Sequence, residues 1–202
     1  SILFGYLSLL YINLGHLWID MLIAHIVATI IIFFFSITFK NSSLYDPFWS
    51  VIPLAIFLYL IYFPEVDDVS FERFVLIGIP IFYYAIRLTW NWLKGWEGLT
   101  EEDFRYTNLY GQFGRFKWFI NFFGIHMFPT LIVNICLFPL YYAISINTEP
   151  LNFIDWFFSI FTVLAVLLEH VSDEQMHKFK SNPANVSKTM NLGLWKYSRH
   201  PN

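Results

Sequence analysis

The chain has 202 residues, of which 57% are hydrophobic, 22% aromatic and 13% charged. This composition is too apolar and too poor in charge for an ordinary soluble domain, and it indicates a membrane protein. The formal net charge of −3 offers no basic surface, so we expect no nucleic-acid partner. The single cysteine, Cys136, cannot form an internal disulfide and is expected to serve in packing.

Six apolar segments follow one another along the chain, and several approach or exceed the ~20 residues that a helix needs to cross the hydrocarbon core. They do not alternate as barrel strands would, so helices are the expected spanning form. The segments are residues 1–14, 18–39, 48–63, 71–93, 116–143 and 153–170. We therefore predict an all-α, multi-pass membrane protein with about six transmembrane helices in a single integral membrane domain, residues 1–202. Kinks are predicted at Pro53, Pro80, Pro129 and Pro139.

The sequence opens on Ser1 within an apolar segment and stops in a polar stretch. We expect it to be a piece of a longer protein, truncated at both ends. A further hydrophobic element is expected after Asn202.

The distribution of charge predicts which loops share a side of the membrane. Basic residues lie at Lys40 and in two polar stretches, 94–117 and 171–202, whereas the connection 64–70 is acidic. If the segments alternate in direction, all the basic stretches fall on one side, which by the positive-inside rule is the cytosol. We expect the inner membrane in a bacterium and the endoplasmic reticulum in a eukaryote.

Polar residues in the fourth apolar segment are the first candidates for chemistry, because such residues are costly inside a membrane. Tyr84, Arg87 and Asn91 are spaced to share one helix face. A buried arginine beside a phenol could bind an anion or a carbonyl oxygen. Alternatively, Arg87 snorkels toward the cytosolic interface and Tyr84 is an interfacial aromatic residue.

A second polar stripe lies where the sixth segment ends. Glu169, Asp173, His177 and Lys180 recur at near four-residue spacing, with Lys178 beside them. The acids could bond ribose or amide groups of a cofactor, and the lysines could meet its phosphates. An amphipathic helix exit with i,i+4 ion pairs would give the same pattern.

The last ten residues form a dense polar cluster. Arg199 suits a phosphate, Tyr197, His200 and Asn202 supply hydrogen-bonding groups, and Gly193 permits close approach. The cluster therefore predicts a binding site for an anionic cofactor. A basic juxtamembrane loop is the alternative.

The stretch 92–106 is rich in Trp, Gly and acids. Thr100 is predicted to cap a helix, with Asp103 at the capping-box position. Arg105 and Tyr106 could reach a cofactor or seal the loop against the membrane surface.

Upstream, Asp46 before Pro47 is most simply a turn or cap residue. His16, Asp20 and His25 are expected at the membrane interface rather than in a metal site, and no metal is predicted.

Four motifs occur in a fixed order: Tyr45–Ser50, Arg87–Trp92, Glu102–Tyr106 and Gly193–Asn202. Together they resemble the multi-pass membrane family related to steroid 5α-reductases (3-oxo-5α-steroid 4-dehydrogenases), in the branch catalogued as a domain of unknown function. The resemblance covers most of the chain from about residue 40. It implies NADPH-dependent reduction of a carbon–carbon double bond conjugated to a carbonyl in a lipidic, steroid-like substrate. It also implies a helical bundle with the nicotinamide deep inside and the phosphates near the cytosolic loops.

The resemblance also implies roles for individual residues. Tyr84 matches the tyrosine that holds the substrate carbonyl, Asp173 matches an aspartate at a helix exit, and Asn202 matches a cofactor-binding asparagine. Lys178 or Lys180 falls near a cofactor-binding arginine of the family, although lysine lacks the planar guanidinium fork. The Gln-Glu pair of steroid reductases has no clear counterpart. The predicted catalytic residues are Tyr84 and Arg87, and the predicted cofactor contacts are Asn91, Arg105, Glu169, Asp173, Lys178, Lys180, Tyr197, Arg199, His200 and Asn202.

Two other functions stay open. Arg-His-Pro near the end of the chain also resembles membrane methyltransferases of prenylated cysteine or phospholipids, whose S-adenosylmethionine favours carboxylates and aromatic faces. The other alternative is a non-catalytic lipid-binding protein of the same fold, since fold does not determine function. The expected partners are a lipidic small molecule and membrane lipids.

Overall fold

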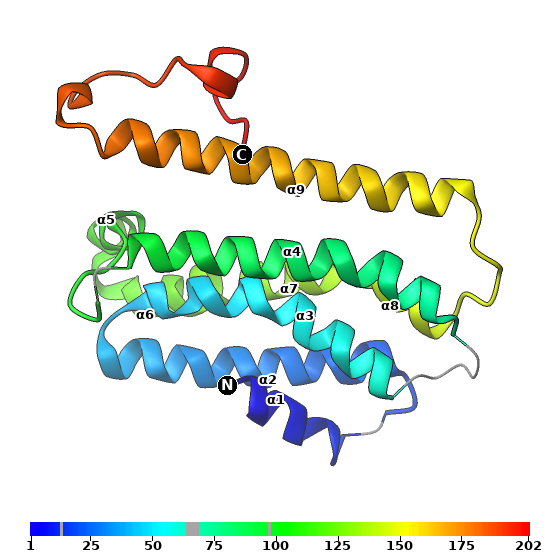
Figure 1. Ribbon diagram of the computed structural model, residues 1–202. Coiled ribbons are helices and arrows are strands. Elements are labelled where there is room, and N and C mark those ends of the chain that lie inside the picture. Colours follow the sequence, from blue (N-terminus) through cyan, green and yellow to red (C-terminus); the bar gives the residue numbers. More distant parts are fainter. Residues whose placement is uncertain (13, 64–68, 97) are drawn as a thin grey trace.

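The computed structural model describes residues 1–12, 14–63, 69–96 and 98–202, which fold into helices without any strand (Figure 1). Five helical stretches are long and apolar enough to cross a membrane: α2 (Leu17–Phe39), η1 (Ser42–Tyr45) with α3 (Asp46–Tyr62), α4 (Phe71–Gly95), the stretch Phe104–Ser145, and α9 (Phe153–Lys180). The all-α, multi-pass prediction is confirmed.

The first of the six predicted segments differs from the other five. Residues 1–14 contain α1 (Ile2–Leu9), whose eight residues are too few to cross the hydrocarbon core. Helix α1 packs against α2 instead. The order of basic and acidic connections is unchanged by this difference, although most of the acidic connection lies outside the described residues.

The fourth spanning stretch is built from short pieces: α5 (Phe104–Phe113), η2 (Gly114–Phe116), α6 (Lys117–Ile120), the π-helix η3 (Asn121–Met127), α7 (Phe128–Cys136) and α8 (Phe138–Ser145). Pro129 and Pro139 lie in the first turns of α7 and α8. Helix α7 continues directly from the π-helix η3, and a single turn residue, Leu137, separates α8 from α7. Such interruptions of a helix are common at proline residues and at π-helical turns. Pro53 and Pro80 lie inside α3 and α4. Two of the four predicted kink positions thus mark interruptions between helical pieces.

Side-chain caps fix where several helices begin. At α9, Asn152 and Asp155 form a complete capping box. At α5, the Asp103 side chain accepts a hydrogen bond from the Arg105 backbone N–H, so the helix begins at Phe104. The prediction that Thr100 caps this helix was wrong, because Asp103 provides the cap three residues later.

Two clusters of buried side chains hold the bundle together. One joins α2, α3 and α8, and the other joins α2 to the start of α3. Helix α9 lies along the outside of α4 (Figure 1) and carries exposed apolar side chains over most of its length. That outer surface suits contact with membrane lipids.

The turn between α2 and α3 is hydrogen-bonded to the acidic loop between α4 and α5. Asn41 is 1% exposed, and its side-chain amide donates to the backbone carbonyls of Leu99 and Glu101 at 3.0 and 2.7 Å. The Ser42 backbone N–H donates to the Glu102 carboxylate at 2.7 Å. These bonds hold the loop over the start of α3 and so form one wall of a polar pocket.

The C-terminal tail folds back onto α9 (Figure 1). The Leu194 N–H donates to Oε1 of Gln175 at 2.9 Å, and the Trp195 indole N–H donates to the Ser172 carbonyl at 3.0 Å. Gly193 has a φ of 60°, and a Cβ there would lie 2.3 Å from Oε1 of Gln175. The close approach predicted for Gly193 exists, and it is made to α9.

Substituting Gly193→Ala should release this tail. The left-handed conformation costs a non-glycine residue roughly 1–2 kcal/mol, and the new methyl group must displace the Gln175 side chain. We expect the undocked fraction to rise about tenfold or more, measured as faster tryptic cleavage after Lys196 in the detergent-solubilised protein.

Gly95→Ala is the matched control, because a Cβ at Gly95 meets no neighbour within 4 Å. Equal cleavage rates for the two variants would contradict the tail geometry.

Candidate functional site

A buried arginine joins α4 to α9. Arg87 is 7% exposed, and its two terminal nitrogens each lie 2.5 Å from a carboxylate oxygen, one of Glu169 and one of Asp173. The two acids are one helical turn apart and therefore share a face of α9. The side chain of Asp173 is 11% exposed and that of Glu169 is 37% exposed, so Asp173 is the more strongly desolvated partner.

The C-terminal tail closes this cluster. The Asn202 side-chain amide donates to the second carboxylate oxygen of Asp173 at 2.7 Å. The Ser172 hydroxyl is fully buried and lies 3.4 Å from the Pro201 carbonyl oxygen. Residues predicted from three separate motifs, on α4, on α9 and in the tail, are thus brought together.

The charge of the cluster limits what it can bind. One guanidinium meets two carboxylates, which leaves one negative charge in excess. Such a site favours ligand hydroxyl and amide donors over phosphate oxygens. The buried Nε–H of Arg87 has no hydrogen-bond partner among the described residues, so one donor is still available for an oxygen of a ligand.

Tyr84 lies one turn before Arg87, in the wall of a large apolar pocket of ≈ 680 Å³. Side chains of α3, α4, α7, α8 and α9 line this pocket, among them Ile81, Leu140 and Val166. The volume is within the range of small-molecule sites. The fourth segment therefore presents a phenol to an apolar pocket and a guanidinium to a polar cluster.

Asn91 and Arg105 belong to a different pocket. Both line a polar pocket of ≈ 500 Å³, together with Trp49, Trp92 and Trp96 and the acids Asp46, Glu101, Glu102 and Asp103. The Tyr106 hydroxyl donates to Asp46 at 2.6 Å. Tyr84, Arg87 and Asn91 were predicted to share one helix face, but each has different surroundings. Tyr84 lines the apolar pocket, Arg87 pairs with carboxylates of α9, and Asn91 lines the polar pocket.

Arg105 is held locally at the edge of the polar pocket. Its Nε and Nη2 donate to the two carboxylate oxygens of Asp103 at 2.9 and 2.7 Å. This hydrogen bonding lowers the pKa of the Asp103 carboxyl below its usual value. The pair completes the cap of α5 and leaves the Arg105 side chain 64% exposed.

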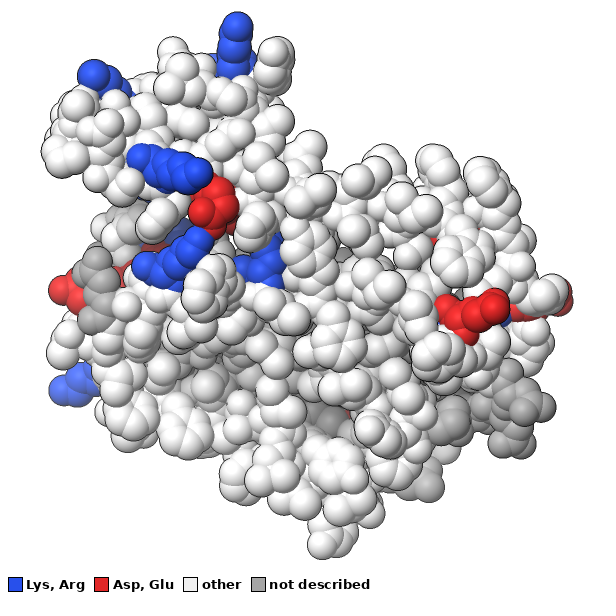
Figure 2. All heavy atoms as spheres, viewed as in Figure 1, with Lys and Arg blue, Asp and Glu red and all other residues white. Residues whose placement is uncertain are grey.

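The remaining predicted cofactor contacts lie on the surface near the tail. Exposed residues of this set are Lys178, Lys180, Tyr197, Arg199 and His200. Lys180 lines a shallow pocket with the segment 185–188. Figure 2 shows blue Lys and Arg side chains gathered at the end of the molecule that carries α5 and the end of α9. A ligand bound at Asp173 would extend toward positive charge.

Sequence reasoning missed the residues that fix the tail and α9 in place. Gln175 and Trp195 hold the tail, and Lys94 forms an ion pair with Glu174. The Ser159 hydroxyl donates to the Leu76 carbonyl at 2.6 Å. Lys94 and Glu174 are ordinary surface charges in the sequence, and no spacing rule connects residues 80 positions apart.

The histidines and Asp20 near the start of the chain do not form a metal site. Within the described residues no group of three His, Cys, Asp or Glu side chains could hold an ion. An Asp20 carboxylate oxygen accepts a hydrogen bond from the Leu14 N–H at 3.1 Å. His16 is exposed, whereas His25 is buried.

Comparison with known proteins gives the chain a family. It is similar to the uncharacterized protein C594.04c of Schizosaccharomyces pombe, with 25% identity over 190 residues, 83% of this chain and 55% of that protein. The chain thus spans about half the length of this relative. No solved structure matches. Residues 32–202 match the family described as "Protein of unknown function (DUF1295)", and because this match covers most of the sequence, the chain belongs to the DUF1295 family.

Proposed function

We propose that the chain is the membrane-embedded part of an NADPH-dependent reductase that acts on a carbon–carbon double bond conjugated to a carbonyl in a lipidic substrate. The observation that carries the proposal is the arrangement along α4. Tyr84 faces an apolar pocket of ≈ 680 Å³, and one turn later Arg87 anchors a polar cluster that reaches the C-terminal tail. The four motifs that resemble steroid 5α-reductases supply the reaction class.

The residues present suit the cofactor. Glu169 and Asp173 would accept hydrogen bonds from ribose hydroxyls or the carboxamide, and the Arg87 Nε–H is an unused buried donor. The phosphates would lie toward the exposed Lys178, Lys180 and Arg199, at the basic end of the molecule (Figure 2). When bound, NADPH supplies the hydride that is added to the β-carbon.

The protein's own contribution would centre on Tyr84. Its phenol would donate a hydrogen bond to the substrate carbonyl and so stabilise the negative charge that develops on that oxygen. Apolar side chains of the pocket would hold a flat lipidic substrate and exclude water. A proton would then reach the α-carbon from a phenol or from water.

We place the basic end at the cytosol. Lys40 follows the first of the five spanning stretches, Lys94 lies in the last turn of the third, and Lys188 and Lys196 follow the fifth. If the stretches alternate in direction, all of these lysines fall on one side of the membrane. The positive-inside rule assigns such connections to the cytosolic side, where NADPH is available.

Methyl transfer from S-adenosylmethionine is the second candidate, because one observation favours it. The polar pocket combines the aromatic faces of Trp49, Trp92 and Trp96 with several carboxylates. Aromatic faces and carboxylates attract a sulfonium cation. This pocket lies apart from Tyr84, so the two candidates place the chemistry at different residues.

Cofactor binding tests the reductase directly. NADPH and S-adenosylmethionine should be titrated separately into the detergent-solubilised full-length protein. We expect saturable NADPH binding that weakens about tenfold in Asp173→Asn and in Asn202→Ala, which is the loss of roughly one charge-assisted hydrogen bond.

Asn202→Ala leaves the ion pairs of Arg87 intact. Weaker NADPH binding in this variant would therefore reflect a lost cofactor contact and not a disrupted fold. Glu174→Gln is the matched control at the adjacent carboxylate, which pairs with Lys94. Binding of S-adenosylmethionine without NADPH binding would sink the reductase and favour the second candidate.

Turnover tests the role of Tyr84. Phenylalanine keeps the ring and removes the hydrogen-bond donor to the substrate oxygen. We expect Tyr84→Phe to lower kcat for a steroid-sized enone by roughly 10²–10³-fold, measured as NADPH consumption, with no change in the Kd for NADPH.

Tyr83→Phe is the matched control, because the Tyr83 ring lies 6.3 Å from that of His170 and does not line the apolar pocket. Equal rates for Tyr84→Phe and Tyr83→Phe would remove Tyr84 from the mechanism.

A further inference from the structure

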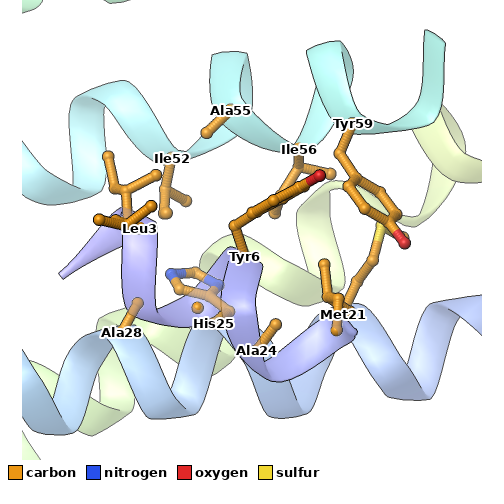
Figure 3. A pocket seen from close by; sticks show the side chains of 13 residues that line it. Leu3, Tyr6, Met21, Ala24, His25, Ala28, Ile52, Ala55, Ile56 and Tyr59 are labelled. Carbon is orange, nitrogen blue, oxygen red and sulfur yellow. The ribbon is translucent and has the colours of Figure 1, made fainter. Parts of the chain in front are cut away.

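A second apolar pocket lies between α1, α2 and α3, apart from Tyr84 and the Arg87 cluster (Figure 3). Its volume is ≈ 400 Å³, and it shares no lining residue with the pocket of Tyr84. Leu3 and Tyr6 of α1, Ala24 of α2, and Ile52 and Ile56 of α3 form much of its wall. None of the described residues that line it is charged.

Close packing of α1 on α2 shapes this pocket. A Cβ on Gly5 would lie 2.8 Å from the Ala24 carbonyl oxygen and 3.1 Å from Cβ of Ala28, so the two helices touch at that point. Leu3 and Tyr6 are 64% and 40% exposed, which places the rim of the pocket at the lipid-facing surface. A lipid could enter sideways from the bilayer.

One polar side chain is buried in this apolar wall. His25 is 3% exposed, and neither Nδ1 nor Nε2 has a hydrogen-bond partner among the residues that the structure describes. Figure 3 shows its ring pointing from α2 into the space between Leu3, Tyr6 and Ile52. Buried polar groups are paired in the large majority of cases, because an unmade hydrogen bond away from water is costly. An imidazole left unpaired at a pocket wall therefore indicates a ligand group that meets it.

The surroundings of His25 define that group. A neutral imidazole offers one donor and one acceptor, and a hydroxyl can satisfy either. A phosphate head group or a carboxylate is disfavoured, because the pocket wall offers no charged side chain to pair with its negative charge. We propose that this pocket binds a neutral lipid with a single hydroxyl group, which hydrogen-bonds to His25 while its hydrocarbon part fills the space between α1 and α3.

A photoreactive long-chain primary alcohol tests this site in the full-length protein reconstituted in lipid nanodiscs. Matched probes carry the same chain with no polar group or with a carboxyl group. We expect saturable labelling by the alcohol, mapped by mass spectrometry to α1–α3. His25→Leu should weaken the alcohol's apparent affinity about tenfold, the loss of one hydrogen bond, and leave labelling by the hydrocarbon unchanged.

His16→Leu is the matched control, since it makes the same change at an exposed histidine, the N-cap residue of the same helix. Ala55→Phe should block all three probes by filling the pocket. Thermal unfolding checks that the variants fold: ligand-free His25→Leu should melt no lower than wild type. The alcohol should raise the melting temperature of wild type and of His16→Leu more than that of His25→Leu. Equal labelling by alcohol and hydrocarbon, strongest labelling by the acid, or labelling mapped elsewhere would each overturn the proposal.

Discussion

The pairing of Arg87 decides how the last helix is attached to the bundle. A guanidinium that is 7% exposed among apolar helices has to be paired, because removing one partner of a buried ion pair costs about 3–5 kcal/mol. Its partners, Glu169 and Asp173, both lie on α9. Among the packed helices, α9 contacts α4 and its own tail. The rotation of α9 that turns Glu169 and Asp173 toward α4 therefore satisfies this buried charge, and the Lys94–Glu174 ion pair and the Ser159–Leu76 hydrogen bond hold α9 to α4 at other points.

The tail depends on the same charge through Asp173. One carboxylate oxygen meets Arg87 and the other accepts from Asn202, so the tail is bonded to a group whose orientation α4 already fixes. Because the cluster carries excess negative charge, it suits ligand donors. The phosphates of a cofactor would need the exposed lysines and Arg199 farther along the tail.

The sequence predicted the helices well and the site in part, for physical reasons. Apolar length alone locates the spans, since the bilayer sets it, and the spacing of Glu169 and Asp173 predicted a shared face. Hydropathy cannot show that a π-helix precedes Pro129, or that Asp103 instead of Thr100 caps α5. Nor can it show that Asn91 lines a pocket whereas Arg87 pairs with carboxylates of α9, because a face 100° wide meets more than one neighbour.

Arg87 and His25 are both buried polar side chains that need hydrogen-bond partners, but only Arg87 finds partners among the described residues. Arg87 reaches partners within the chain, so its burial explains the architecture around α4 and α9. His25 has no partner among the described residues, although its ring is more deeply buried. The difference lies in the neighbouring helix: α9 carries carboxylates opposite Arg87, whereas α1 and α3 present aliphatic and aromatic groups to His25. The hydrogen-bond partner that the neighbouring helices do not provide for His25 can come from the hydroxyl group of a lipid in the bilayer.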